Sequence, residues 1–356
     1  PARLSCYIWR PGKWERARSE GSSVPRRHWE TVEEVELAEQ LGFESAWLAE
    51  SAFFPGRPMS NPLMVAIAAG QRTERIRFGT LATQAPLHHP FHLATQSATC
   101  DILTNGRLDF CLGGRWGVRA SKAFGHGDIS SEESRERVEE AIEIVRQAWT
   151  QERLTYAGKY WQADNLPVQP QPVQQPHPPI LLAANRDETF AYTARMGCGV
   201  IGTLLSQPLP RMRQRLAEFE AARPAQGVDQ PQKSYVMVSF FVAKTRQEAH
   251  ALAKENWRDG DAEAGIAFIK SFGGDPAQAD FTTGATGWML WDFDKAKTMC
   301  LYDEPAACVD YFHRLREELP SMDQCILEFN RRGRIPSEHV RNSMRLFTDE
   351  VLPKLS

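Results

Sequence analysis

The chain has 356 residues, of which 42% are hydrophobic and 24% charged, and its formal net charge is −3 at pH 7. These values are typical of a soluble globular protein, and the charge gives no electrostatic footprint for nucleic acid. No apolar run approaches the length needed to cross a membrane, and no signal peptide precedes Leu4, so we expect a cytoplasmic protein. Seven cysteines without a Cys-x-x-Cys pair argue against a disulfide framework and a zinc site, and we expect no metal.

Short β-rich runs alternate along the chain with segments whose apolar residues recur at helical spacing. The predicted strands cover residues 4–9, 44–49, 75–82, 107–112, 179–184, 199–204, 235–243 and 325–329. The predicted helices cover residues 31–41, 61–72, 90–103, 131–149, 187–196, 209–222, 246–259 and 337–352. Eight strands, each followed by a helix, predict a single-domain α/β fold over residues 1–356, a (β/α)8 TIM barrel. A doubly wound open sheet is the alternative, but it needs fewer repeats and usually a glycine fingerprint after the first strand, which is absent here.

Two stretches depart from this rhythm. Residues 151–179 are rich in proline and glutamine, and we interpret them as an irregular excursion rather than a linker, because a strand follows at once. Residues 260–304, between the seventh and eighth strands, mix glycines with aromatic residues, and a loop of roughly forty residues is uncommon in a compact domain. We expect this insertion to be an active-site lid, with a helical excursion packed outside the barrel as the alternative.

Residues 70–117 contain two strand–helix units and end in Gly113-Gly114 and Trp116. Together with AEQLGFESAWLAE, ESRERVEEAIEIVRQAW and SMRLFTDEVLPKL, in this order over nearly the whole chain, they resemble the bacterial luciferase-like flavin-dependent monooxygenases. The resemblance implies a two-component system in which a separate flavin reductase supplies reduced FMN, and O2 and a small organic substrate are consumed. F420-dependent hydride transfer and a non-catalytic flavin-binding protein are the alternatives.

The same resemblance implies a homodimer or a dimer of dimers. The two helices at residues 61–72 and 90–103 would form the interface, because they carry more apolar positions than one core-facing stripe requires. These positions are Leu63, Ile67, Leu93, Ala94, Ala98 and Leu103.

A flavin phosphate needs backbone N–H groups at a helix start, a hydroxyl or amide, and usually one cation. Asn185, Arg186 and Thr189 supply these groups directly after the fifth strand, where the resembling family binds the phosphate. We expect the side chains of Asn185 and Asp187 to cap the helix that begins there. The alternative is a plain helix cap beside a surface arginine.

Further cofactor contacts are implied only by the resemblance. Gly114, Arg115 and Trp116 follow the fourth strand, where relatives have glycines, an arginine for the phosphate and a tryptophan. Arg135 matches another family arginine that can reach the phosphate, and a salt bridge is its alternative role. Leu81-Ala82 matches the place where relatives hold a non-proline cis peptide bond against the flavin ring.

The candidate catalytic residues differ from the family pattern. Glu50 ends the second strand and is expected at the cofactor, but Ser51 and Ala52 stand where relatives often have two histidines, the first of which assists catalysis. Of the neighbouring His88 and His89, His89 matches a histidine of relatives and is the candidate catalytic residue. A structural hydrogen bond is the alternative for a histidine beside a proline in such a loop.

Overall fold

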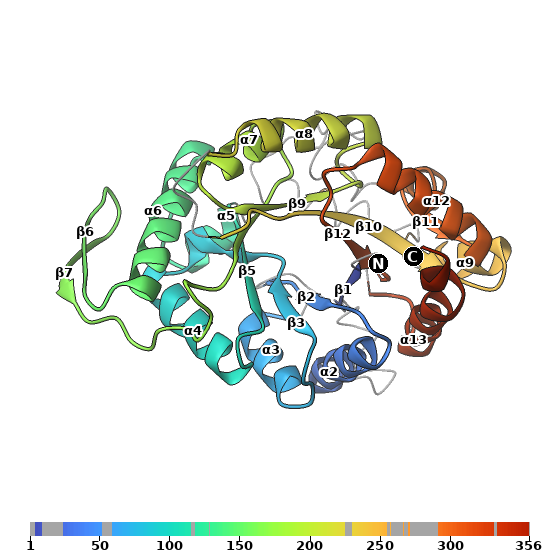
Figure 1. Ribbon diagram of the computed structural model, residues 1–356, viewed down its shortest axis with the longest axis horizontal. Coiled ribbons are helices and arrows are strands. Elements are labelled where there is room, and N and C mark those ends of the chain that lie inside the picture. The colour runs from blue at the N-terminus through green and yellow to red at the C-terminus, as the bar shows by residue number, and fades with distance from the viewer. Residues whose placement is uncertain are drawn as a thin grey trace.

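Eight parallel strands close into a barrel that is surrounded by helices (Figure 1). The barrel strands are β1 (Leu4–Tyr7), β2 (Ser45–Leu48), β3 (Arg77–Thr80), β5 (Leu108–Gly113), β8 (Ile180–Ala183), β9 (Gly199–Thr203), β10 (Ser234–Val242) and β12 (Gln324–Glu328). They follow one another in chain order around the barrel, and the pairing of β9 with β10 and of β12 with β1 closes it. The predicted (β/α)8 fold is therefore confirmed. This computed structural model describes residues 4–8, 24–51, 59–114, 118–127, 129–224, 230–254, 257, 266, 270, 291–330 and 333–355.

The barrel strands bury one side chain toward the interior and the next toward the helices. The interior cluster consists of Tyr7, Trp47, Ala49, Ala82, Cys111, Leu181, Ile201, Tyr235, Met237 and Ile326. Their chain neighbours belong to the larger core between strands and helices, as the two-residue period of a strand requires. The fully buried Trp47 ring lies over Gly79 of the neighbouring strand, since a Cβ on Gly79 would lie only 2.1 Å from its Cε3 atom. The opposite side of this ring packs edge-on against Tyr235, at 5.3 Å between ring centroids.

The helices lie outside the barrel. They are α2 (Val24–Gln40), α3 (Pro62–Gly70), α4 (Pro90–Leu103), α5 (Val118–Ala123), α6 (Ser131–Thr150), α7 (Asp187–Arg195), α8 (Leu209–Ala221), α9 (Arg246–Lys254), α12 (Pro305–Glu318) and α13 (Ser337–Leu346). The bounds of α4 agree with the predicted ones, whereas α2 begins at Val24 instead of residue 31, and α5 and α12 were not predicted. No helix in the described ranges is long and apolar enough to cross a bilayer.

Residues 151–179 leave the barrel, as predicted, but they are not wholly irregular. They contain an antiparallel hairpin of β6 (Leu154–Ala157) and β7 (Gln162–Leu166), which lies beyond α6 in Figure 1. Its turn is fixed to α6, because the Glu140 carboxylate accepts the backbone N–H groups of residues 159–161. These strands could not be predicted, because most side chains of β7 face solvent and show no apolar pattern.

The end of the 260–304 insertion is regular structure, which corrects the prediction of one continuous loop. Residues 291–304 contain the short helix α11 (Phe293–Ala296) and the strand β11 (Leu301–Asp303). Strand β11 pairs with the carboxyl-terminal half of β10, and Trp291 stacks on Trp257. This part is packed against the barrel. Most of the predicted lid, from residue 260 to residue 290, lies outside the described residues, so its role stays a prediction.

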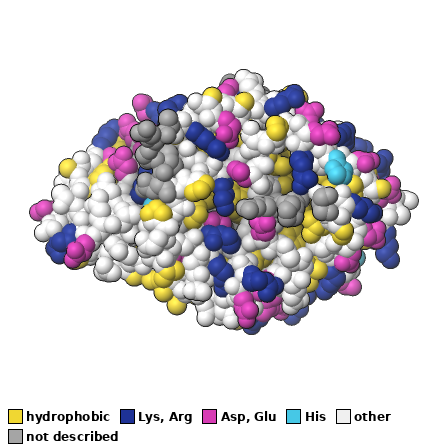
Figure 2. Space-filling view, viewed as in Figure 1, with side chains coloured by type: hydrophobic (Ala, Val, Ile, Leu, Met, Phe, Trp, Pro, Cys, Tyr) yellow, Lys and Arg dark blue, Asp and Glu magenta, His cyan; other side chains and the backbone are white. Residues whose placement is uncertain are grey.

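The surface of α3 and α4 keeps some apolar side chains exposed. Leu63, Leu93, Ala94 and Ala98, which suggested an interface, are buried within the chain itself. Met64 and Leu103 are instead 67% and 47% exposed, and Figure 2 shows hydrophobic side chains along the edge of the molecule where α4 lies. The dimer stays a prediction that now depends on a smaller apolar surface.

Candidate active site

The carboxyl ends of β2, β3 and β5 bring together a carboxylate, an imidazole and an amide. In a (β/α)8 barrel the loops that follow the strands face this end, and catalytic groups gather there. Glu50 follows β2, Gln84 lies in the two-residue strand β4 (Thr83–Gln84) after β3, and His88 follows one turn of 3-10 helix later. Strand β4 pairs with the end of β5, which sets Gln84 opposite Gly113.

The Glu50 carboxylate is held from two sides although only 4% of the residue is exposed. Its Oε2 atom accepts the backbone N–H of Gln84 at 2.7 Å, and its Oε1 atom lies 2.7 Å from His88 Nε2. These hydrogen bonds replace the water that a carboxylate loses on burial. Because a carboxylate only accepts, Nε2 carries the proton of this pair, and His88 Nδ1 is left to exchange a proton with another group.

The peptide bond between Leu81 and Ala82 is cis, as the resemblance implies. Ala82 belongs to the barrel interior, and its carbonyl oxygen accepts a hydrogen bond from Gln84 Nε2 at 3.1 Å. The other end of this amide, Gln84 Oε1, is buried without a hydrogen-bond partner in the described structure, and so is Thr83 Oγ1. Buried polar atoms of native proteins nearly all have partners. The two orphan atoms therefore point to a polar group that is not part of the chain.

Gly113 lets Ala82 and Gln84 approach the end of β5 closely, and Gly114 leaves space beside it. A Cβ at Gly113 would lie 3.1 Å from both Ala82 Cβ and Gln84 Nε2, whereas the nearest atom to a Cβ at Gly114 is Val138 Cγ2 at 3.7 Å. Two successive glycines at a strand end allow a flat ring to approach the backbone. The edge of an isoalloxazine ring carries carbonyl and N–H groups, which suit an amide and a hydroxyl. The residues present therefore fit a flavin.

The amino end of α7 is not capped as predicted. Its N-cap residue is Arg186, and no side chain caps the helix. Asp187 instead binds Arg211, with Oδ2 2.6 Å from Nη2, and Arg215, with the same oxygen 2.8 Å from Nη2. The Arg211 hydrogen bond holds the pKa of Asp187 below its ordinary value. The prediction that Asn185 and Asp187 cap the helix was wrong, because two arginines of α8 take the carboxylate.

This arrangement leaves the start of α7 available to an anion. The negative charge of Asp187 is compensated by two guanidinium groups, and the side chains of Arg186 and Thr189 make no hydrogen bond to any described residue. Helix amino ends with open N–H groups bind phosphate readily. Arg186 and Asn185 are exposed beside them. The geometry suits a phosphate here.

The remaining predicted cofactor residues are placed as follows. The Gly114 carbonyl accepts a hydrogen bond from Ser134 Oγ. Arg135 makes the alternative salt bridge, with Nε 3.9 Å from Glu139 Oε1. Arg115 and Trp116 lie outside the described residues, so their contacts stay predictions.

His89, the candidate catalytic residue, does not contact Glu50. It is the N-cap of α4, where its Nδ1 atom accepts the N–H of Phe91 at 3.4 Å, and its ring meets Trp161 of the hairpin edge-on. Partial burial, and then the nearby His92, lower the pKa of His89 below its ordinary value. In the structure His89 makes the structural contact, so its catalytic role stays a prediction, and His88 is the histidine that reaches the carboxylate.

Sequence reasoning also missed a second buried carboxylate. Glu328 at the end of β12 is 1% exposed and accepts a hydrogen bond from Ser239 Oγ at 2.5 Å. It lies two residues after Ile326 of the interior cluster, so it faces the barrel interior. The signal was present, because a glutamate inside the apolar strand Gln324–Glu328 needs a partner or a function.

Thiol and metal chemistry have little support among the described residues. Within the described ranges, no three potential metal-ligating side chains of His, Cys, Asp or Glu come together. Burial raises the pKa of the Cys111 thiol well above its ordinary value, which keeps the sulfur protonated and unreactive.

Known proteins resemble this chain in both sequence and fold. The oxygenase component of the flavin-dependent trigonelline monooxygenase of Acinetobacter baylyi is 27% identical over 64% of this chain and 62% of its own length. The F420-dependent hydroxymycolic acid dehydrogenase of Mycobacterium tuberculosis is 29% identical, again over 64% of this chain and 62% of the relative. These matches thus span less than two thirds of either relative.

Two solved structures share the fold over nearly the whole of both chains. Monooxygenase RslO1 from Streptomyces bottropensis has a TM-score of 0.81 and 25% identity, with 99% of this chain and 100% of that one covered. The oxygenating constituent of 3,6-diketocamphane monooxygenase from Pseudomonas putida, solved with FMN, has a TM-score of 0.76 at 19% identity, with coverages of 100% and 99%.

A sequence model of the family described as luciferase-like monooxygenase matches residues 14–310, which is most of the chain. This match, the closed barrel and the polar groups at its carboxyl end agree with one another: the chain belongs to the luciferase-like monooxygenase family.

Proposed function

We propose that this protein is the oxygenase of a two-component flavin-dependent monooxygenase. It uses reduced FMN from a separate flavin reductase, together with O2, to oxygenate a small organic substrate. The observation that carries the proposal is the Glu50–His88 pair, which lies beside the orphan polar atoms of Thr83 and Gln84. Family membership and the FMN complex of the diketocamphane enzyme support a flavin at this position.

Each group of the site has a separate task. Bound reduced FMN would supply the electrons that activate O2, while the chain binds, orients and manages protons. Arg186 and the N–H groups of α7 would hold the phosphate, and Ala82, Gln84 and Gly113 would line the ring. Glu50 fixes the ring of His88 through Nε2, so that Nδ1 can take or give a proton at the oxygen being transferred.

His88 would then serve where Ser51 replaces the family histidine. The imidazole reaches Glu50 from the loop after β4 instead of from the position next to the carboxylate. A carboxylate that orients a histidine is a common arrangement for proton transfer. The role of the missing histidine would thus be kept by a residue at another place in the chain.

A second candidate function is F420-dependent hydride transfer. It is favoured by relatives of similar identity that use F420, including a glucose-6-phosphate dehydrogenase of Intrasporangium calvum at 30% identity over 49% of this chain. Anaerobic titration with reduced FMN and with reduced F420 separates the two. The FMN complex is then mixed with 18O2 and a panel of aldehydes, ketones and sulfonates, and products are analysed by mass spectrometry.

We expect tight binding of reduced FMN and one atom of 18O in a product. His88→Gln should lower the oxygenation rate by roughly 10²- to 10⁴-fold, the usual contribution of a positioned acid or base, and leave FMN affinity unchanged. His89→Gln is the matched control, since it alters the neighbouring histidine without touching Glu50. Equal rates for the two variants would refute the role of His88. Preferential F420 binding would favour hydride transfer, and flavin binding without any reaction would indicate a binding protein.

A further inference from the structure

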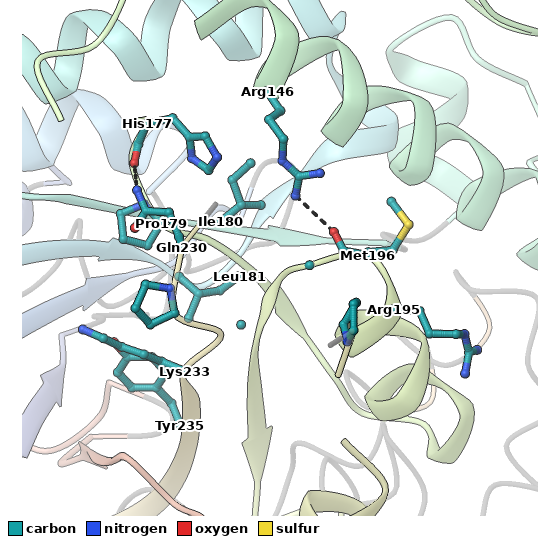
Figure 3. A pocket seen from close by; sticks show the side chains of 14 residues that line it. Arg146, His177, Pro179, Ile180, Leu181, Arg195, Met196, Gln230, Lys233 and Tyr235 are labelled. Carbon is teal, nitrogen blue, oxygen red and sulfur yellow. Dashed lines mark hydrogen bonds between the residues drawn. The ribbon is translucent and has the colours of Figure 1, made fainter. Parts of the chain in front are cut away.

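A cavity of about 210 Å³ lies at the end of the barrel opposite Glu50 and His88 (Figure 3). Its walls include Ile180 and Gly199, the first residues of β8 and β9, and Lys233 and Tyr235 at the start of β10. Helix α6 covers it with Arg146. The cavity therefore belongs to the amino ends of the strands and is separate from the candidate active site.

The charged side chains that line this cavity are all cationic. Arg146, Arg195 and Lys233 belong to the lining, and no aspartate or glutamate does. Arg146 points from α6 toward the loop before β9, where its Nη2 atom donates to the carbonyl of Met196 at 3.1 Å (Figure 3). The same Nη2 atom lies 3.8 Å from Cys198 Sγ, so both hydrogen bonds of this guanidinium use one of its three nitrogens. The Lys233 carbonyl accepts the N–H of Val200 at 2.8 Å, but its side chain makes no hydrogen bond or ion pair with any residue in the described ranges.

Other partly buried arginines of this chain form ion pairs with carboxylates. Arg211 and Arg215 share the carboxylate of Asp187, and Arg77 binds Asp109 at 2.7 Å. A half-buried cation without a carboxylate at a cavity wall is therefore unusual for this molecule. A negatively charged guest would give these cations the carboxylate partner that the chain does not provide at the cavity wall.

Tyr235 adds a hydroxyl donor to the cavity wall. Only 2% of the residue is exposed, and its side chain belongs to the lining. Burial raises the pKa of Tyr235 above its ordinary value, so the phenol stays neutral and can donate. A guest with an acceptor oxygen would accept this hydrogen bond.

The remaining walls set the size and polarity of the guest. Ile180, Leu181 and Met196 make part of the lining apolar. A water molecule occupies about 30 Å³ of liquid, so the cavity has room for about seven. An inorganic anion would leave most of the apolar wall uncovered. An acid with a short apolar body would fill both parts.

We propose that this cavity is a binding site for a small organic carboxylate. The carboxylate faces the Arg146 guanidinium and the apolar body lies against Leu181, while the Lys233 ammonium and the Tyr235 hydroxyl add a positive charge and a donor to the same wall. The site is additional to the proposed oxygenase function and does not depend on it. Charge-assisted hydrogen bonds to a guanidinium give such a site a preference for an anion over a neutral amide of the same shape.

The test is a titration of the full-length protein with acetate, butyrate and benzoate, followed by calorimetry or NMR. Benzamide is the neutral control for benzoate. We expect benzoate to bind at least about tenfold more tightly than benzamide, and Lys233→Gln and Tyr235→Phe each to weaken benzoate by about tenfold, one lost hydrogen bond to a charged group. Both substitutions keep the volume of the side chain, and thermal unfolding verifies that each variant is folded.

Two controls separate this site from the flavin site. Arg186→Ala and a saturating concentration of FMN should leave benzoate affinity unchanged, because they act at the other end of the barrel. Displacement of benzoate by FMN, equal binding of benzoate and benzamide, or unchanged affinity in both lining variants would each overturn the proposal. Failure of all three carboxylates to bind would show that the cavity holds water only, and would overturn it as well. None of these outcomes bears on whether FMN binds and reacts.

Discussion

Exchanging the two glycines after β5 for alanine, one at a time, should change stability in opposite directions. Replacing a glycine by alanine where the backbone angles suit alanine stabilises a protein by about 0.4–1 kcal/mol, because the unfolded chain loses conformational freedom. Neither Gly113 nor Gly114 has a positive φ, so both gain this term. At Gly113, however, the new methyl would meet Ala82 Cβ and the Gln84 amide at 3.1 Å, inside the roughly 3.5–4.0 Å at which carbon atoms attract best.

Overpacking of this kind costs about 1–3 kcal/mol. Gly113→Ala should therefore lower the free energy of unfolding by about 0.5–2 kcal/mol, the difference between the two effects. Gly114→Ala has its nearest described atom at 3.7 Å and should be neutral or slightly stabilising. Urea denaturation monitored by tryptophan fluorescence measures both values. Because the displaced Gln84 amide lines the proposed ring site, Gly113→Ala should also weaken FMN binding.

Two outcomes of the glycine substitutions would contradict this reasoning. If Gly114→Ala destabilises the protein as much as Gly113→Ala does, the cost comes from the backbone and not from the contact with Ala82 and Gln84. If Gly113→Ala destabilises the fold but leaves FMN affinity unchanged, the glycine is needed for packing alone. In that case the flavin ring does not lie beside Gln84.

Three further predictions concern the rest of the molecule. Arg186→Ala should weaken FMN more than riboflavin in equilibrium titrations, because only FMN has the phosphate; equal losses would contradict the phosphate site. The pKa of Asp187 is lower in the folded protein than the value of about 3.9 in the unfolded chain. The carboxylate therefore stabilises the fold at pH values above about 3.9, and this contribution is lost as the pH falls through the folded pKa. Asp187→Asn should therefore flatten the acid side of a stability–pH curve, and an unaltered curve would argue against the Arg211 bond. Leu103→Glu should shift a dimer toward monomer in sedimentation, and a wild-type protein that is monomeric at micromolar concentration would refute the dimer itself.

Features with a local cause could be predicted from the sequence. The bounds of α4 agreed because Pro90 begins the helix and the turn at Thr104-Asn105-Gly106 ends it. The start of α6 agreed because Ser130 caps it through the N–H of Glu133. The exposed hairpin of residues 154–166 could not be recognised, because its polar strands have no alternating pattern. Asp187 was misjudged for a related reason, since its partner Arg211 lies 24 residues further along the chain.

The site was predicted less completely than the barrel. His88 and His89 are adjacent, and the conformation of the loop after β4 decides which of them reaches the active site. This loop brings His88 into contact with Glu50, which lies 38 residues earlier in the chain. No local pattern distinguishes His88 from His89. The role of Gln84 likewise depends on the pairing of β4 with β5, which only the folded chain reveals.

The Trp47 ring bears on the side from which small molecules reach the barrel. It fills the interior between Gly79 and Tyr235, and an eight-stranded barrel is only wide enough for side chains to fill it. Trp47 and its neighbours thus separate the two ends of the barrel along its axis. A substrate of the proposed oxygenase would reach the site from the carboxyl face, and a guest of the opposite cavity would influence that face through the strands that the two ends share, such as β10.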